Sequence, residues 1–292
     1  MSGQLGTGKS SHQERDCYFQ GYIEDDPYST VALSTCSGLR GTIYKNGFRY
    51  AIEPDESLEY FSHVVYRIDT SQSDKFETGL DKLNCKVKLC IELRSVVSVA
   101  LERGGLDRGI CPCNPEAKPP KNSAYVELCM VTTKPQFQFH DENETFLVES
   151  VLELINTINT IFQPLNTHMV LAGIEIWSNE NLINTDTDNA QDILDKFLKW
   201  KSDFLDSRIK CDIAGLSLFD NRVTGQVNGL AYLEGACSLN KAGFFSVMNL
   251  NKLVLSSDLF IHELGHVLGM KHDTPGCTCR SGNTTCTMNE IL

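Results

Sequence analysis

The chain has 292 residues, more than a single domain usually holds, and this length predicts two domains that can each bury a core. Its 26 basic and 38 acidic residues give a net charge of -12, which argues against nucleic acid and anionic membrane surfaces as partners. No apolar run approaches the length that spans a bilayer, so we expect no transmembrane segment.

The cysteine content indicates the compartment. Twelve cysteines are many for a reduced cytosolic enzyme and favour an oxidising environment. Two N-glycosylation sequons, at residues 143–145 and 283–285, favour the same environment. Residues 1–11 are polar and lack the apolar stretch of a signal peptide. We therefore expect a protein of the secretory pathway that lacks its natural beginning.

Residues 3–10 satisfy the phosphate-loop pattern G-x-x-x-x-G-K-S. That loop needs a buried strand before it and a helix after it, so that backbone N–H groups converge on the phosphates. Only two residues precede this one, and residues 11–16 have no apolar periodicity. We therefore predict a flexible terminus over residues 1–15 and no nucleotide partner.

Residues 17 to about 100 contain short alternating runs punctuated by glycines, among them 28–34 (YSTVALS) and 61–66 (FSHVVY). This pattern predicts a mainly β domain. The proline-rich stretch at residues 109–120 is unsuited to regular structure, so we place the domain boundary there.

Strands and helices alternate beyond this boundary, which indicates an α/β domain. The predicted strands cover residues 125–131, 170–177, 213–219 and 229–233, and a helix is expected over 144–162. A second, amphipathic helix runs through Ile193, Phe197, Trp200 and Phe204. A third helix follows Ser256 or Ser257 as its N-cap.

The third helix carries the residues of a catalytic zinc site. His262 and His266 stand four residues apart and share one face of the helix. Gly269 lets the chain leave the helix through a conformation that side chains resist, so that His272 can supply a third imidazole. Three protein ligands leave one zinc position open for a water molecule, and Glu263 is placed to take its proton as general base.

The extended pattern is far more specific than the bare H-E-x-x-H, which occurs by accident on amphipathic helices. It fixes five residue types over eleven positions, and Met288 follows it, as in the metzincin signature. Asp273 comes directly after the third histidine. In this the chain resembles the ADAM (a disintegrin and metalloproteinase) or reprolysin family of metzincins.

The resemblance covers nearly all of residues 16–290. Residues 16–22 (DCYFQGY), 33–41 (LSTCSGLRG) and 52–54 (IEP) look like the family's inhibitory prodomain, and 125–128 (YVEL), 175–177 (EIW) and 229–232 (GLAY) look like its catalytic domain. It implies an ADAM-type prodomain at 16–121 and a reprolysin-type metalloprotease domain at 122–292, truncated after the methionine turn. The implied fold is an α/β (α+β) metzincin domain with a mixed, mostly parallel sheet and a zinc-binding helix, preceded by the mainly β prodomain.

The resemblance also implies structural roles. Cys17 is expected to pair with Cys36, and Cys277 with Cys286, whereas Cys237 and Cys279 pair in the family with a segment beyond Leu292. Met288 is expected beneath the metal in a tight turn. The family binds structural Ca²⁺ near positions that match Glu127 and Asp212. The strand at 229–233 is expected to form the sheet edge that lines the substrate cleft.

ADAM proenzymes are commonly held latent by a prodomain thiolate on the zinc, for which the candidates are Cys85, Cys90, Cys111 and Cys113. None is followed by the glycine of the usual motif, and the boundary carries no basic processing run.

Two functional hypotheses follow. The first is a zinc-dependent metalloendopeptidase that acts on protein or peptide substrates in the extracellular space or at the cell surface. The alternative is a catalytically silent or latent ADAM-like protein that retains its prodomain and acts in cell adhesion or protein interaction.

Overall fold

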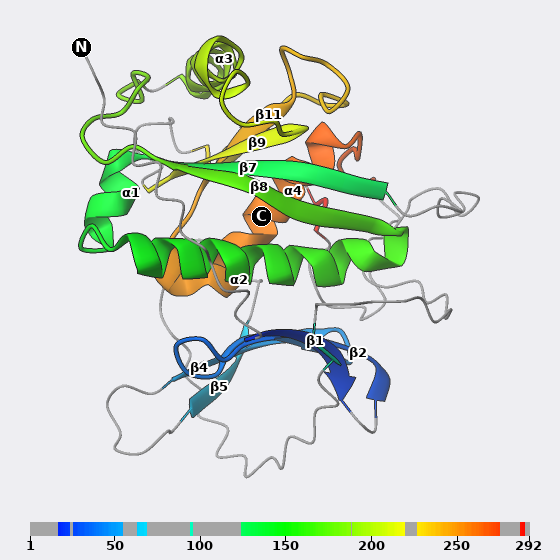
Figure 1. Cartoon of the computed structure of the whole chain (residues 1–292). Helices are drawn as coiled ribbons and strands as arrows, with labels where there is room; N and C mark the ends of the chain where they lie inside the picture. The colour runs from blue at the N-terminus through cyan, green and yellow to red at the C-terminus, as the bar shows by residue number, and fades with distance from the viewer. Residues whose placement is uncertain are drawn as a thin grey trace.

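The computed structural model describes residues 17–23, 26–54, 63–68, 94–95, 124–187, 189–219, 227–274 and 287–289. Within these residues the chain forms a six-stranded and a five-stranded sheet, with two helices, α2 and α4, between them (Figure 1). The phosphate-loop pattern and the predicted domain boundary lie outside the described residues.

The six-stranded sheet is antiparallel throughout and belongs to the N-terminal region, which confirms the predicted mainly β region. Asn46 and Gly47 both have positive φ, as a two-residue hairpin turn requires. The predicted disulfide between Cys17 and Cys36 is confirmed. The sheet order is β5-β4-β3-β2-β1-β6, with β1 (Tyr18–Ile23), β2 (Asp26–Ser34), β3 (Arg40–Lys45), β4 (Phe48–Pro54), β5 (His63–Ile68) and β6 (Arg94–Ser95).

The five-stranded sheet is mixed and mostly parallel, as predicted. Its only antiparallel pairing joins the edge strand β10 to β11. Strand β11 was not predicted, because the first four of its five residues are buried and no alternation of apolar and polar residues marks it. The order is β10-β11-β9-β7-β8, with β7 (Ala124–Thr132), β8 (Thr167–Ile176), β9 (Ile213–Leu218), β10 (Gly229–Ala231) and β11 (Gly243–Val247).

Helix α2 (Glu144–Phe162) has the predicted bounds, and Asn143 caps it by accepting a hydrogen bond from the Phe146 N–H at 3.0 Å. It continues into the short helix η1 (Gln163–Leu165). The segment Glu144–Leu165 is long and apolar enough to span a membrane by length and composition alone, but more than half of its apolar window is buried inside the fold. It packs between the two sheets (Figure 1).

Helix α3 (Ala190–Trp200) lies on the other face of the five-stranded sheet, as Figure 1 shows, and continues as a π-helix, η2 (Lys201–Leu205). The prediction that Phe204 lies on the apolar face was wrong. Phe204 is 57% exposed and Leu205 is buried instead, because the wider π turn rotates the buried face by about one residue. A short helix α1 (Lys134–Phe139) precedes α2 and was not predicted.

Helix α4 (Leu253–Val267) carries the zinc motif and follows the short helix η4 (Leu250–Lys252). It begins before Ser256 and Ser257, so the N-cap prediction was wrong. Both hydroxyls bond other groups: that of Ser257 donates to the Val254 carbonyl within the helix at 2.7 Å, and that of Ser256 bonds the backbone of Asn249, which precedes the helix. Serines that form such bonds fit helix interiors as well as caps.

A second disulfide, which the sequence analysis did not predict, joins Cys129 of β7 to Cys211, just before β9. Because β7 and β9 are parallel neighbours, residues 82 positions apart in sequence meet here. The bond ties the segment just before β9 to the interior of its neighbour β7.

Candidate metal centre

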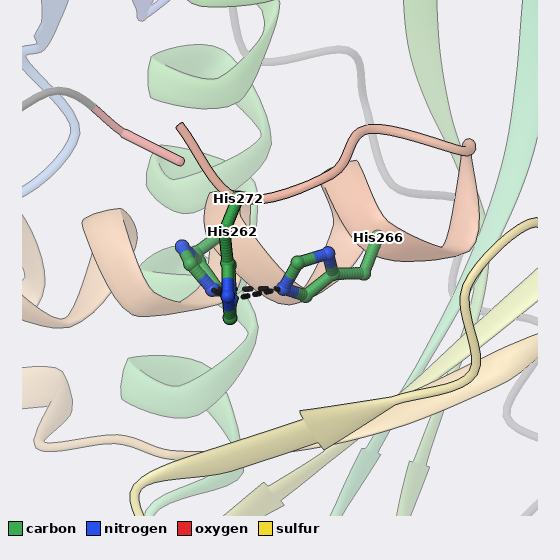
Figure 2. Close-up of side chains that lie close together, drawn as sticks. All are labelled: His262, His266 and His272. Atoms are coloured by element: carbon green, nitrogen blue, oxygen red, sulfur yellow. Dashed lines mark hydrogen bonds between the residues drawn. The ribbon is translucent and has the colours of Figure 1, made fainter. Parts of the chain in front are cut away.

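Three histidines converge at the end of α4. His262 and His266 project from one face of the helix, four residues apart. The helix ends at Val267, and Gly269 has a φ of 97°, the left-handed conformation that the sequence analysis expected there. The chain then turns back and brings His272 to the other two imidazoles (Figure 2).

The Nε2 atoms of the three rings face one another. They lie 3.0 Å apart between His262 and His266, 2.9 Å between His266 and His272, and 3.2 Å between His262 and His272 (Figure 2). A tetrahedral Zn²⁺ with Zn–N distances of about 2.0–2.1 Å separates its ligand nitrogens by about 3.3 Å. The observed spacing is therefore close to what such an ion requires.

Backbone carbonyls orient two of the rings. The Nδ1 of His262 lies 2.7 Å from the Thr287 carbonyl oxygen, and that of His266 lies 2.8 Å from the Met270 carbonyl oxygen. A carbonyl only accepts, so each Nδ1 carries the proton and donates it, which leaves each Nε2 with a free lone pair. Neither carbonyl could be predicted from the sequence, since any residue type supplies a backbone acceptor.

The electrostatics favour neutral imidazoles. Burial lowers the pKa of His262 to about 4, against the opposing Thr287 carbonyl and with help from the two neighbouring histidines. Burial also lowers the pKa of His266. Neutral nitrogens pointing at one centre repel unless a cation lies between them, so the donor set fits a divalent metal such as Zn²⁺. Among the described residues, these are the one group of three or more potential ligands within reach of a single ion.

Glu263, the predicted general base, is 5% exposed. Burial raises the pKa of its carboxyl to about 8. A divalent cation at the histidines would act in the opposite direction, because positive charge favours the carboxylate. The side chain lies against Gly229 of the edge strand: a Cβ built on Gly229 would come within 2.5 Å of Glu263 Oε1. Gly229 thus leaves the space that the carboxylate occupies, a role that the sequence analysis missed.

Strand β10 lies at the edge of the sheet, as expected, and among the described strands it pairs only with β11. The loop after β10 is fastened to the end of α4. The Glu234 N–H donates to the His266 carbonyl at 2.9 Å, and the Ala236 N–H donates to the Val267 carbonyl at 3.0 Å. These hydrogen bonds therefore fix the position of β10 relative to α4, the helix that carries His262 and His266 (the metal helix).

Met288 lies against the metal helix. It is 5% exposed, and its sulfur would come within 2.7 Å of a Cβ built on Gly265, between the two helical histidines. Its carbonyl accepts the Asp273 N–H at 2.8 Å, which ties the segment after the third histidine to residues 287–289.

The predicted calcium residues lie together and are not part of the histidine group. The Glu127 N–H donates to the Asp212 carboxylate at 2.9 Å, and the Asp212 N–H donates to the Glu127 carbonyl at 2.8 Å. Both side chains are exposed, and no third acidic, histidine or cysteine side chain of the described part joins them as a ligand set. The Ca²⁺ site therefore stays a prediction.

The remaining cysteine predictions are largely untested. Cys237 is exposed and forms no disulfide with a described residue. The other cysteines named above, Cys277, Cys279 and Cys286 and the latency candidates Cys85, Cys90, Cys111 and Cys113, lie outside the described residues.

Comparison with known proteins points to one family. A family model described as reprolysin (M12B) family zinc metalloprotease matches residues 124–292. Disintegrin and metalloproteinase domain-containing protein 9 of Homo sapiens is 31% identical over 276 residues, 94% of this chain and 32% of that protein. Protein 1a of the same series from Mus musculus is 31% identical over 91% of this chain and 31% of its own length. Protein 2 from Rattus norvegicus is 31% identical over 94% of this chain and 34% of its own length.

The chain thus spans about a third of the length of these relatives. A solved structure titled "Structure of a chaperone-substrate complex" matches 58% of this chain and 28% of that chain with a TM-score of 0.42 and 12% identity, too distant a likeness to carry an argument. The family match, by contrast, begins at β7 and contains all three histidines and Glu263. The chain belongs to the reprolysin (M12B) family of zinc metalloproteases, with ADAM proteins among its relatives.

Proposed function

We propose that this chain is a zinc-dependent metalloendopeptidase that hydrolyses peptide bonds of protein substrates. The observation that carries the proposal is the convergence of three imidazole nitrogens within 3.2 Å of one another, with a buried glutamate next to the first of these histidines on the same helix. His262, His266 and His272 would hold the zinc, and Glu263 would serve as the general base.

The edge strand supports an extended peptide as the substrate. An added peptide strand can satisfy the open backbone groups of β10, while side-chain pockets select among sequences. Gly229 lies on this strand and contacts Glu263, so a peptide paired with β10 passes close to the base. This arrangement favours cleavage within a chain, where the substrate extends to both sides of the base.

The proton transfers fall to Glu263. A zinc ion held by the three histidines would supply Lewis acidity, which lowers the pKa of water and polarises a carbonyl. The Glu263 carboxylate takes a proton from the attacking water and later delivers it to the leaving amine nitrogen. Its burial supports this role, because a carboxyl whose pKa is raised toward neutrality can both accept and return a proton.

We further propose the division into a prodomain at residues 16–121 and a protease domain at 122–292. It is supported by the larger apolar clusters, which do not mix the two regions: Val31, Leu33, Ile43 and Ile52 form the core of the N-terminal sheet, and two others cover the faces of the five-stranded sheet, whereas one small cluster of Ala51, Ile68 and Val254 joins the regions. Location in the secretory pathway is proposed on the cysteine content and the two disulfides.

Cleavage of internally quenched peptides by the purified 292-residue chain tests the proposal. We expect cleavage that a zinc chelator abolishes and added Zn²⁺ restores. Glu263→Gln should lower kcat/KM by about 10²–10⁴-fold, because it removes the general base but leaves the three nitrogens in place. Zinc content measured on the same samples should be unchanged in Glu263→Gln and reduced in His272→Ala.

Two outcomes would overturn the proposal in different ways. If the chain binds zinc but the wild type and Glu263→Gln cleave equally little, it is a silent member of the family, as the alternative hypothesis holds. If the chain binds no zinc, the metal assignment itself is wrong.

A further inference from the structure

The N-terminal sheet contacts the metal helix directly. Arg49 of β4 forms an ion pair with Asp258 of α4, and its Nη1 donates to the Val254 carbonyl at 3.2 Å. Val254 also packs with Ala51 and Ile68 of the sheet. The contact therefore joins the sheet to the first turns of α4, the turns that lead into His262.

This ion pair is largely withdrawn from water. The side chains of Arg49 and Asp258 are 14% and 12% exposed, and the guanidinium lies 5.1 Å from the centre of the Tyr44 ring. Burial raises the pKa of Asp258, and the Arg49 charge opposes that rise. A charge buried to this degree is stable only beside a charge of opposite sign. Removing either side chain therefore leaves the other charge buried and unpaired, which strongly destabilises the fold.

No other group in the described part of the chain replaces Arg49. Asp258 Oδ1, Arg49 Nε and the Tyr44 hydroxyl are all buried without a hydrogen-bond partner there. If Arg49 were removed, no neighbouring donor would be available to the Asp258 carboxylate. The helix turn that carries Asp258 would then have to move to expose the carboxylate to water.

The turn that would move is the one before the first metal ligand. Asp258 and His262 are four residues apart, one helical turn, within the unbroken helix Leu253–Val267. His262 and His266 depend on this helix for their position, whereas His272 lies beyond its end. A shift or fraying of the first turns therefore changes the positions of His262 and His266 relative to His272.

We propose that Arg49 is a positioning residue for the zinc site: by neutralising Asp258 it holds the first turns of α4, so that the N-terminal sheet contributes to zinc affinity. This inference rests on the proposed function, because it takes the three histidines to bind zinc. In this proposal the N-terminal sheet contacts the first turns of α4 and does not contact the three histidines through Arg49.

The test measures zinc affinity of the full 292-residue chain by competition with a chromophoric chelator, well below the melting temperature. We expect Arg49→Met to weaken zinc binding about tenfold, as loss of groups that orient metal ligands does. Arg49→Lys should keep most of the affinity, because it retains the charge. The double variant Arg49→Met/Asp258→Asn should regain most of what Arg49→Met loses, because no buried charge is left unpaired.

Two matched variants separate this effect from general destabilisation. Arg208→Met breaks a two-bonded pair with Glu175, at 3.0 and 3.1 Å, away from α4, and should leave zinc affinity unchanged. Asn156→Ala removes hydrogen bonds from α2 to Gln20 and to the Phe19 and Leu33 carbonyls, which loosens the sheet without touching Asp258. It should weaken zinc binding less than Arg49→Met does.

The outcomes are distinguishable. A wild-type chain without measurable zinc binding would refute the proposed function. Zinc binding by Arg49→Met equal to the wild type would refute only the positioning role. An Asn156→Ala variant as weak as Arg49→Met would also refute it, since docking of the sheet in general would then be responsible. Should Arg49→Met fail to fold, the double variant decides: near wild-type zinc affinity would support the role, and an affinity about tenfold below the wild type would count against it.

Discussion

Gly229→Ala should disable the general base while leaving the metal in place. A Cβ at this position would lie 2.5 Å from Oε1, 2.7 Å from Cγ and 2.8 Å from Cδ of Glu263, whereas ordinary contact of such an atom begins at 3.4 Å. The carboxylate must therefore retreat by about 0.9 Å. Displacement of a catalytic group by about 1 Å can cost on the order of 10²-fold in rate, about 2.7 kcal/mol of transition-state stabilisation.

The assay is kcat/KM for a quenched peptide, divided by the zinc content of the same sample. We expect a fall of about 10²-fold for Gly229→Ala, with zinc content unchanged because the three atoms nearest to the new Cβ all belong to Glu263. Gly173→Ala is the matched control: its Cβ would press to 2.9 Å on the Ile209 side chain, at the opposite edge of the sheet. It should cost stability and leave activity per zinc intact.

The result that would refute this reasoning is a Gly229→Ala variant with more than half of the wild-type activity per zinc. Equal losses in Gly229→Ala and Gly173→Ala would refute it as well, because a clash at any sheet position would then suffice. In the first case, the Glu263 carboxylate could avoid the new methyl group without leaving its working position. In the second, the loss would not come from displacement of Glu263.

Three further predictions concern stability. Burial raises the pKa of Glu153 from 4.5 to about 7 in the folded chain. The contribution of the Glu153 carboxyl to the free energy of unfolding is therefore fully present below pH 4.5 and is lost as the pH rises through 7. Urea unfolding at pH 5 and pH 8 should show this loss, up to about 3 kcal/mol, and Glu153→Gln should reduce the difference. Replacing Cys129 and Cys211 together by alanine should lower the free energy of unfolding by about 2–5 kcal/mol, whereas Cys237→Ser should not change it. Met288→Ala should cost about 2–4 kcal/mol in the same measurement, and a loss below 1 kcal/mol would show that the buried site is not tightly packed.

Local features of the sequence were sufficient to predict the metal helix and several other elements. The spacing of His262 and His266 places both on one helix face whatever the rest of the fold does, and Gly269 marks the exit. The bounds of α2 follow from the Asn143 cap and from apolar residues at helical spacing. Short-range rules decide such features, so they are legible without tertiary structure.

Other elements left no local signal or a misleading one. Strand β11 is almost wholly buried, so the alternation that reveals a half-buried strand is absent. The π turn of η2 carries Phe204 to the surface although its spacing places it on the apolar face. In both cases packing against distant parts of the chain overrides the local pattern.

The sequence alone was sufficient to propose the ligands, the base and the chemistry of the site, because residue type and helical spacing carry that information. Only the tertiary structure decided what supports them. Gly229 makes room for Glu263 because β10 is laid beside α4, and Arg49 reaches Val254 across 205 residues of sequence. Such contacts arise from the packing of sheet on helix, and no periodicity along the chain encodes which residue will lie opposite which.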